Sequence, residues 1–434
     1  MVEQGMYRTV WRWHFYAGLM VLPVLLWLAV TGALYLYKPE IEGIVYRGWS
    51  TASGPALAIT PMVARVEAAS GARVVSLSRP ADPAASWRMT LAAADGTHRL
   101  AFVDPATGRV LGTARDGGVM GLVRSLHSLM ITGPVGNAVV EIVAGWTILL
   151  VLSGVYLWWP RGTNRALALR GRPTGRLFWR DLHASTGAIA GAVILFLAVT
   201  GMPWSGIWGK GLQTVVAIYG LGRPPSPGPS PWQRGKDHGG HMPAKAALPW
   251  AMQEATAPAG RKGHDIGADR AVAIANGRGL SAPWLLVPPA EAGNPYLVAS
   301  VIERADEARA IYVDAANGRV LADMHYADFG IGARTIEWGI AVHQGQQYGE
   351  ANRLVMLAGC IAIVLLTISA PILWWKRRRN GRLEAPPRAV DPKRARGVAT
   401  IMLAVGVLFP LTGATMVAAL LGDRLWLRGR RRIA

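Results

Sequence analysis

Four histidines stand at positions that repeat along the chain, and their chemistry is what the rest of the sequence must position. His14 and His183 each open an apolar stretch that reaches a Thr-Gly pair seventeen residues later. His127 and His343 each stand thirty-one residues before a Trp-Trp pair. Ionisable side chains at the ends of membrane-length apolar stretches are costly and are functional candidates by default. The repeat predicts two pairs, His14 with His183 and His127 with His343, one at each side of a helical bundle.

Two imidazoles that face each other across a helical bundle can hold the iron of b-type haem. Gly18 and Gly187 follow the first two histidines by four residues and would leave room for the macrocycle. Nearby arginines could pair with the haem propionates; they are Arg12, Arg124, Arg180 and Arg353. Zinc is less favoured, because neither pair is accompanied by a carboxylate or a cysteine. A single histidine at a helix end is more often an interfacial or hydrogen-bonding residue, so the prediction of two haems b rests on the four histidines occurring in register.

The composition predicts an integral membrane protein. Apolar residues make up 51% of the 434 residues and charged residues only 17%, and the apolar ones gather in long stretches. About 20 apolar residues cross a bilayer. Five stretches are that long, at about 15–37, 138–159, 184–208, 353–375 and 398–421. The first is longer than the apolar part of a signal peptide and lacks a small-residue cleavage site, so we expect a retained signal anchor.

The formal net charge of +20 lies mainly in short segments. The loops 161–182 and 376–397 are strongly basic, whereas the long segments between spans are nearly neutral. This is the positive-inside pattern, which puts the N-terminus and both basic loops in the cytoplasm and the long segments outside. Nucleic-acid binding is not expected. The one cysteine, Cys360, excludes an intrachain disulfide, iron–sulfur ligation and covalent haem attachment through a Cys pair.

The predicted organisation alternates membrane spans with soluble segments, and the repeat indicates that four core spans arose by tandem duplication. Short strands and a helix in each long outer segment predict two small α+β modules. The segments are 1–38 (N-terminus and span one), 39–126 (first outer module), 127–160 (span two with its histidine segment), 161–182 (basic loop), 183–209 (span three), 210–342 (linker and second outer module), 343–375 (span four with its histidine segment), 376–397 (basic loop) and 398–434 (span five and basic tail).

The last apolar stretch allows two topologies. A fifth crossing would put the basic residues between Arg424 and Arg432 outside, against the positive-inside rule. A re-entrant hairpin that turns at Pro410 would have two arms, each too short to span a bilayer. We expect the crossing.

Two further polar features have no counterpart in the repeat. Glu141 lies inside the second apolar stretch and is either a proton carrier or an interfacial acid. His238, His241 and Met242 follow a proline-rich linker and could gather a soft metal ion. Neither feature has the support that registered copies give to the four histidines.

The doubled pattern resembles the PepSY-associated transmembrane family, in which PepSY modules alternate with helices bearing His-x3-Gly…Thr-Gly and Leu-His…Gly…Trp signatures. The resemblance covers nearly the whole chain through Trp375. It implies an α-helical bundle in the bacterial inner membrane, with the N-terminus cytoplasmic and two PepSY-like modules periplasmic. The family's helix-end histidines fall on His14, His127, His183 and His343.

Members of this family include iron-uptake proteins and siderophore reductases. The resemblance therefore implies a reductase that passes electrons through haem to a ferric siderophore or another Fe(III) chelate in the periplasm and releases Fe(II). The basic loops are too small for a flavin or dinucleotide domain, so quinol or a separate cytoplasmic reductase is the expected electron donor. We expect the chelate to dock in the groove between the two outer modules, near His127 and His343.

Two other classes of function remain open at this point. The protein could be a non-redox scaffold whose PepSY modules bind a periplasmic partner, such as a protease or an uptake component. It could also be a transporter that uses Glu141. A visible absorption spectrum separates haem protein from scaffold, and uptake without redox chemistry would indicate the transporter.

Overall fold

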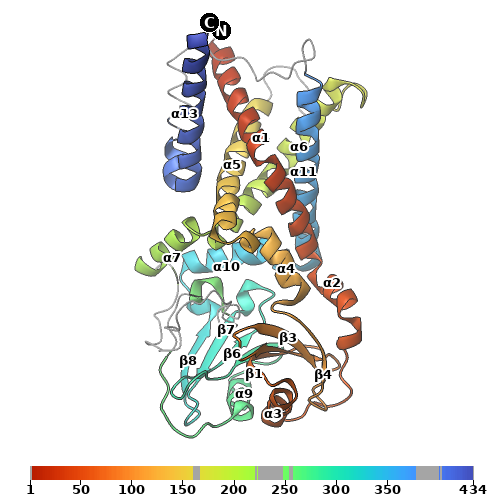
Figure 1. Cartoon of the computed structure of the whole chain (residues 1–434), viewed down its shortest axis with the longest axis vertical. Helices are drawn as coiled ribbons and strands as arrows, with labels where there is room; N and C mark the ends of the chain where they lie inside the picture. Colours follow the sequence, from red (N-terminus) through yellow and green to blue (C-terminus); the bar gives the residue numbers. More distant parts are fainter. Residues whose placement is uncertain are drawn as a thin grey trace.

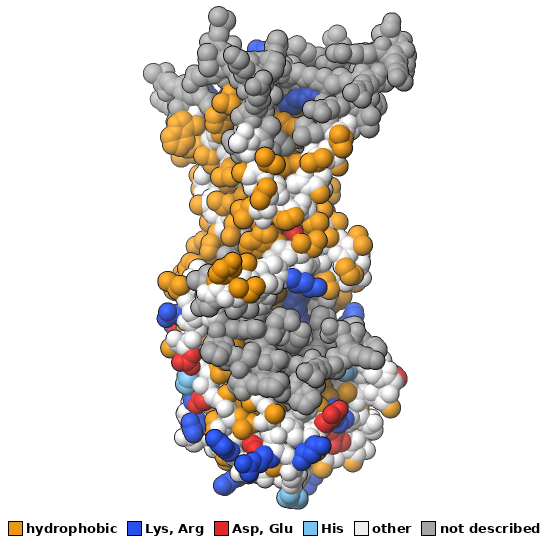
Figure 2. All heavy atoms as spheres, turned by 90° about the vertical axis from the view of Figure 1, so that its left-hand side faces the viewer, with side chains coloured by type: hydrophobic (Ala, Val, Ile, Leu, Met, Phe, Trp, Pro, Cys, Tyr) orange, Lys and Arg blue, Asp and Glu red, His pale blue; other side chains and the backbone are white. Residues whose placement is uncertain are grey.

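Four long helices form an elongated bundle at one end of the molecule (Figure 1). The computed structural model describes residues 2–159, 167–219, 222, 248–253, 258–377, 400 and 403–433. The bundle helices are α1 (Val2–Leu36), α5 (Pro134–Trp158), α6 (Arg176–Gly201) and α11 (Gly349–Trp375). Within the described ranges, these four helices are the ones that are long and apolar enough to cross a membrane. Hydrophobic side chains cover the visible face of the bundle, whereas charged ones gather at the opposite end (Figure 2).

The last apolar stretch is a hairpin and not a fifth crossing. Its helix breaks at Phe409, and α13 (Pro410–Ile433) follows. The chain reverses there, because a Cβ atom on Gly413 would lie 2.7 Å from the Cα atom of Gly406, seven residues earlier. The indole of Trp208 stacks on Phe409, with ring centroids 5.9 Å apart. The end of α13 lies beside the start of α1 (Figure 1), so the expected single helix is corrected to a helical hairpin.

Contacts with α5 hold the first part of α13 against the bundle. The indole Nε1 of Trp146, on α5, donates a hydrogen bond to Thr415 Oγ1 at 2.9 Å. Gly145, also on α5, leaves space for Thr412, whose side chain would clash with a Cβ atom at that position. A hairpin that packs against protein need not span the bilayer by itself. This arrangement also keeps the basic tail at the end of the bundle where the chain begins, as the positive-inside rule requires.

The two outer segments fold together into one antiparallel sheet of eight strands in the order β4-β3-β2-β1-β5-β6-β7-β8. The first segment supplies β1 (Arg73–Arg79), β2 (Trp87–Ala92), β3 (His98–Val103) and β4 (Val110–Arg115). The second supplies β5 (Trp284–Val287), β6 (Tyr296–Ser300), β7 (Arg309–Val313) and β8 (Val320–His325). Matching hairpins turn at Gly108 (φ 74°) and Gly318 (φ 75°), where glycine has no steric penalty.

The join between the two segments is the pairing of β1 with β5, which sets Leu77 opposite Leu286. Two helices, α3 (Ile59–Ser70) and α9 (Ala268–Gly277), cover the face of the sheet that lies away from the bundle (Figure 1). A single apolar core lies beneath both helices and continues across the join. The expectation of two separate modules is therefore wrong, because they share a sheet and a core; the docking of a chelate between them stays a prediction.

Short helices connect the sheet to the bundle (Figure 1). They are α2 (Lys38–Val45), α4 (Gly118–His127), α7 (Trp208–Ile218) and α10 (Ile331–His343). The helix α4 follows β4 and α10 follows β8, which are the two outermost strands of the sheet. Ala333, Ile336 and Ile340 on α10 pack against the core on the near face of the sheet. The sheet thus positions the two helices that end at His127 and His343.

Candidate functional site

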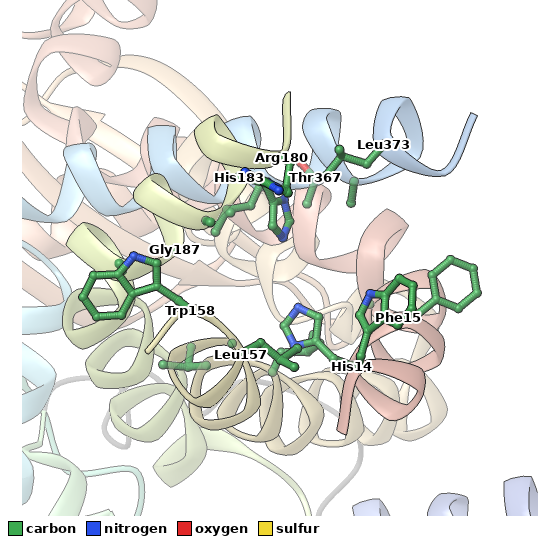
Figure 3. Close-up of a pocket in the computed structure, with 18 of the residues that line it drawn as sticks. His14, Phe15, Leu157, Trp158, Arg180, His183, Gly187, Thr367 and Leu373 are labelled. Carbon is green, nitrogen blue, oxygen red and sulfur yellow. The ribbon is translucent and has the colours of Figure 1, made fainter. Parts of the chain in front are cut away.

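His14 and His183 face each other across a cavity in the bundle (Figure 3). His14 lies on α1 and His183 on α6. Their ring centroids are 6.4 Å apart and the ring planes are nearly perpendicular, at 89°. We call these two residues the inner pair, since they lie near the end of the bundle that carries the start of α1. The structure brings together the two histidines that the repeat predicted to meet there.

His127 and His343 form a second pair, the outer pair, where the bundle meets the connecting helices. His127 is the last residue of α4 and His343 the last residue of α10. Their ring centroids are 6.5 Å apart and the planes are inclined at 74°. The spacing is almost that of the inner pair, although the second pair comes from different helices. Each half of the chain therefore supplies one histidine to each pair.

Every one of the four imidazoles has its Nδ1 atom within hydrogen-bond distance of a hydroxyl group on a neighbouring helix. The pairs are His14 with Ser153 (2.8 Å), His183 with Ser369 (2.8 Å), His127 with Thr31 (3.0 Å) and His343 with Thr200 (2.8 Å). Serine serves the inner pair and threonine the outer pair, in both halves. A contact that recurs four times fixes the orientation of each ring.

Each hydroxyl group also lies near a backbone carbonyl of its own helix. Ser153 Oγ is 2.6 Å from the carbonyl of Leu149, and the other three hydroxyls have similar carbonyl partners. A hydroxyl whose hydrogen goes to the carbonyl accepts toward the ring, so the histidine then donates from Nδ1 and leaves Nε2 available to a metal. That is the tautomer of a metal-ligating histidine whose second nitrogen is held by a hydrogen bond.

The spacing of both pairs fits two axial ligands of one metal. Imidazoles that bind one metal ion from opposite sides, each through a nitrogen at about 2 Å, have ring centroids roughly 6 Å apart. The observed separations are 6.4 Å and 6.5 Å. No group of three or more His, Cys, Asp or Glu residues that could hold a metal ion occurs in the described part of the chain. The donor set is thus two imidazoles per site, as haem requires, and not the three or four ligands of a zinc site.

The cavity around the inner pair has a volume of about 740 Å³, within the range of small-molecule and cofactor sites. Its lining is mainly apolar and includes Phe15, Leu157 and Trp158 (Figure 3). Gly18 and Gly187 line it as well, as the sequence predicted. A Cβ atom at either glycine would contact only a leucine, at 3.9 Å and 3.8 Å. These two positions leave open space beside the rings.

Other glycines lie directly against the imidazoles. A Cβ atom on Gly154 would be 3.3 Å from Cε1 of His14, and one on Gly32 would be 3.2 Å from Cε1 of His127. Contacts this short would displace the ring by a few tenths of an ångström. The absence of a side chain at Gly154 and Gly32 therefore allows each ring its observed position.

The four arginines predicted to bind propionates lie in different environments. Arg180 lines the inner cavity and lies beside His183 (Figure 3). Arg12 is held over the ring of Tyr16, and Arg124 is exposed on α4, three residues before His127. Arg353 forms ion pairs with two glutamates, Glu40 and Glu350. Of the four, only Arg180 lines the cavity; the propionate role of all four stays a prediction.

Sequence reasoning did not identify the hydroxyl partners. Thr31 and Thr200 were part of the repeated motif but had no assigned role, and Ser153 and Ser369 were missed. Both serines stand twenty-six residues after the outer histidine of their own half. Comparing the two halves position by position would have found them.

Glu141 has a structural role in this fold. Its side chain is 1% exposed, and its Oε2 atom accepts hydrogen bonds from the backbone N–H groups of Ile207 (3.0 Å) and Trp208 (3.2 Å). A carboxylate at the start of a helix satisfies N–H groups that lack partners within the helix. Glu141 thus fixes the start of α7. His238, His241 and Met242 lie outside the described residues.

The family model described as "PepSY-associated TM region" matches residues 11–377. The match includes all four bundle helices, the eight-stranded sheet and both histidine pairs. No curated protein matches the chain. Together with the four apolar helices, the match shows a membrane protein.

Proposed function

The chain belongs to the PepSY-associated transmembrane family, and on that premise we propose that it is a haem-containing reductase of the bacterial inner membrane. It passes electrons across the bilayer to a ferric siderophore or similar Fe(III) chelate in the periplasm, which releases Fe(II). The observation that carries this proposal is the pair of matching histidine sites, each with two imidazoles at a spacing that suits two ligands of one iron and each ring held at Nδ1 by a hydroxyl group. A tandem duplication explains why the same arrangement occurs twice.

The positions of the two sites favour transfer of electrons across the membrane. His14 and Thr31, which contacts His127, are seventeen residues apart on α1, or about 25 Å of helix. The hydrocarbon core of a bilayer is about 30 Å thick. The inner and outer pairs therefore lie near opposite surfaces, with the positive-inside rule placing the inner pair toward the cytoplasm and the sheet in the periplasm.

The protein's own groups prepare each site for its cofactor. The serine and threonine hydroxyls contact Nδ1 of each histidine and orient the rings. The lining of the inner cavity is mainly apolar, as suits the ring of haem, and Gly18 and Gly187 leave space beside the histidines. When bound, haem b would supply a carrier of single electrons. The four histidines are the proposed ligands, with two haems per chain.

The overall reaction balances with quinol or a separate cytoplasmic reductase as the donor. One quinol supplies two electrons and releases two protons, and two Fe(III) chelates each take one electron. Siderophores bind Fe(III) through hard oxygen donors and hold Fe(II) more weakly. A one-electron reduction is therefore sufficient to release the iron.

A visible absorption spectrum of the purified protein tests this proposal. We expect a Soret band, sharp α and β bands on reduction, and two haems per chain. His14→Ala or His183→Ala should remove the inner haem, about half of the total, whereas His264→Ala, at an exposed position outside the bundle, should remove none. Adding a ferric siderophore to the anaerobically reduced protein should restore the oxidised spectrum.

Two results would contradict the proposal. A folded, colourless preparation from haem-replete cells would favour the alternative of a PepSY scaffold that binds a periplasmic partner. A haem protein whose reduced form reacts with no Fe(III) chelate would leave the haem sites but remove the reductase function.

A further inference from the structure

Positive charge gathers at one part of the inner cavity. Four arginines line this cavity, namely Arg170, Arg176, Arg180 and Arg377. Among the residues that line it, Asp181 is the one carboxylate. Asp181 lies on α6, two residues before His183. The charged group is therefore attached to the same helix as one of the proposed haem ligands.

Asp181 is buried, with its side chain 6% exposed, and it binds two of these arginines. Arg170 donates from Nε to Oδ2 at 2.8 Å, and Arg180 donates from Nε and Nη2 to Oδ1 at 3.0 Å and 2.8 Å. The backbone N–H of Arg170 also donates to Oδ2, at 3.3 Å. One carboxylate thus links the loop before α6 to the helix itself and fixes two guanidinium groups.

The charges in this group do not balance. Two guanidinium groups share one carboxylate, so the trio of Arg170, Arg180 and Asp181 keeps one positive charge beside an apolar cavity. The side chains of Arg170 and Arg180 are 45% and 52% exposed, so their remaining nitrogens are open to an anion. The bonds to Asp181 use Nε and Nη2 of each arginine, so Nη1 of each is not engaged by Asp181. Guanidinium groups held in this way suit planar carboxylates.

We infer that Asp181 is a positioning residue that holds Arg170 and Arg180 toward the propionate carboxylates of the group bound between His14 and His183. The inference rests on the proposed function and extends it, because it assigns the orientation of the inner haem to a buried acid two residues from its ligand. The propionates would then lie at the arginine side of the cavity, and the apolar edge of the ring would lie among the apolar residues.

Haem whose propionates are blocked as methyl esters is the direct probe of this contact. The His343→Ala variant, which keeps the inner pair, is prepared without haem and loaded either with haem or with haem dimethyl ester. The ratio of the two dissociation rates into a haem-scavenging apoglobin then measures what the carboxylates contribute. We expect the ester to dissociate about tenfold faster than haem, and Asp181→Asn to remove most of that difference, since partners that orient a binding group contribute 10- to 100-fold.

A matched control exists in the sheet. Asp323 binds Arg309 at 2.9 Å and Arg278 at 3.8 Å, so it also joins two arginines, but away from the cavity. Asp323→Asn should leave the ratio of dissociation rates unchanged. Asp181→Glu keeps the charge, so in this variant the ester should again dissociate faster than haem, although by less than in the wild type.

The outcomes separate this inference from the function on which it rests. If the inner pair takes up neither form of haem, the proposed function fails and the inference fails with it. If haem binds and the ester still dissociates about tenfold faster than haem in Asp181→Asn, the inference alone is overturned. If that variant instead loses co-purified phosphatidylglycerol while the ratio is unchanged, the arginines bind a lipid phosphate and the inference is likewise overturned.

Discussion

Thr200→Val is the sharpest test of the hydroxyl–imidazole contacts, because valine keeps the shape of threonine and removes only the oxygen. Thr200 Oγ1 lies 2.8 Å from Nδ1 of His343, and it donates to the carbonyl of Phe196. In the variant, the buried ring loses this partner, and the loss of a partner for a buried polar group costs about 1–3 kcal/mol. The ring can avoid that cost by moving its proton to Nε2, which then no longer has a lone pair for a metal. Either outcome weakens ligation by roughly 10- to 100-fold, the usual effect of losing such a partner.

The rate of haem loss from the outer site measures this effect. In a chain that carries His14→Ala, haem is left only at the outer pair, and Thr200→Val should speed its loss at least tenfold. Thr214 is a matched control, because its hydroxyl bonds to the carbonyl of Lys210 in its own helix and contacts no histidine ring. Thr214→Val should have no effect. A folded Thr200→Val protein that loses haem no more than twofold faster would refute the role of this hydroxyl in ligation.

Three further predictions concern other parts of the molecule. Burial raises the pKa of Glu337 to about 7, so ionising this carboxylate should cost the wild type up to about 3 kcal/mol of stability as the pH rises from below 4.5 to above 7. Glu337→Gln avoids that loss, and melting curves of the two proteins should diverge with rising pH; parallel curves would contradict the assignment. Gly187→Leu should fill the inner cavity and lower the haem content by about half without unfolding the protein, whereas full occupancy would place the macrocycle elsewhere. A reporter that fluoresces only in the cytoplasm should be fluorescent when it is fused after the last residue. If a reporter that is active only in the periplasm works at that position instead, the fifth crossing is supported.

The four bundle helices were predictable because long apolar stretches are the strongest signal in a sequence. Their boundaries in the structure differ from the predicted ones by a few residues at most positions, except that α1 and α6 extend further toward basic residues. The last stretch was predicted wrongly because hydropathy measures only apolar content. A hairpin and a crossing can have the same content, and contacts such as Trp208 on Phe409 decide between them.

The continuous sheet was also missed, although the sequence held a sign of it. Strand β5 reads Trp-Leu-Leu-Val, and three of its four residues are buried. A strand that is apolar on both faces is typical of the centre of a sheet, and β5 is central because β1 pairs with it. A module that ended at β5 would have exposed that strand as an edge.

The histidine pairs were predictable from spacing alone, because duplicated residues at equivalent positions meet across a two-fold arrangement. The geometry that distinguishes a ligand from a buried histidine was not predictable. It depends on the 2.8 Å contact of Ser153 with His14 and on similar contacts elsewhere, which join residues more than ninety positions apart.

The eight-stranded sheet gives the two histidine pairs different mechanical surroundings. The helices that carry the outer pair follow β4 and β8, the two edge strands of one sheet. The width of the sheet therefore helps to set the distance between the two rings. The inner pair lies on α1 and α6 and is not attached to the sheet. The tilt of membrane helices depends on the thickness of the surrounding bilayer. A change in bilayer thickness should therefore alter the spacing of the inner pair more than that of the outer pair.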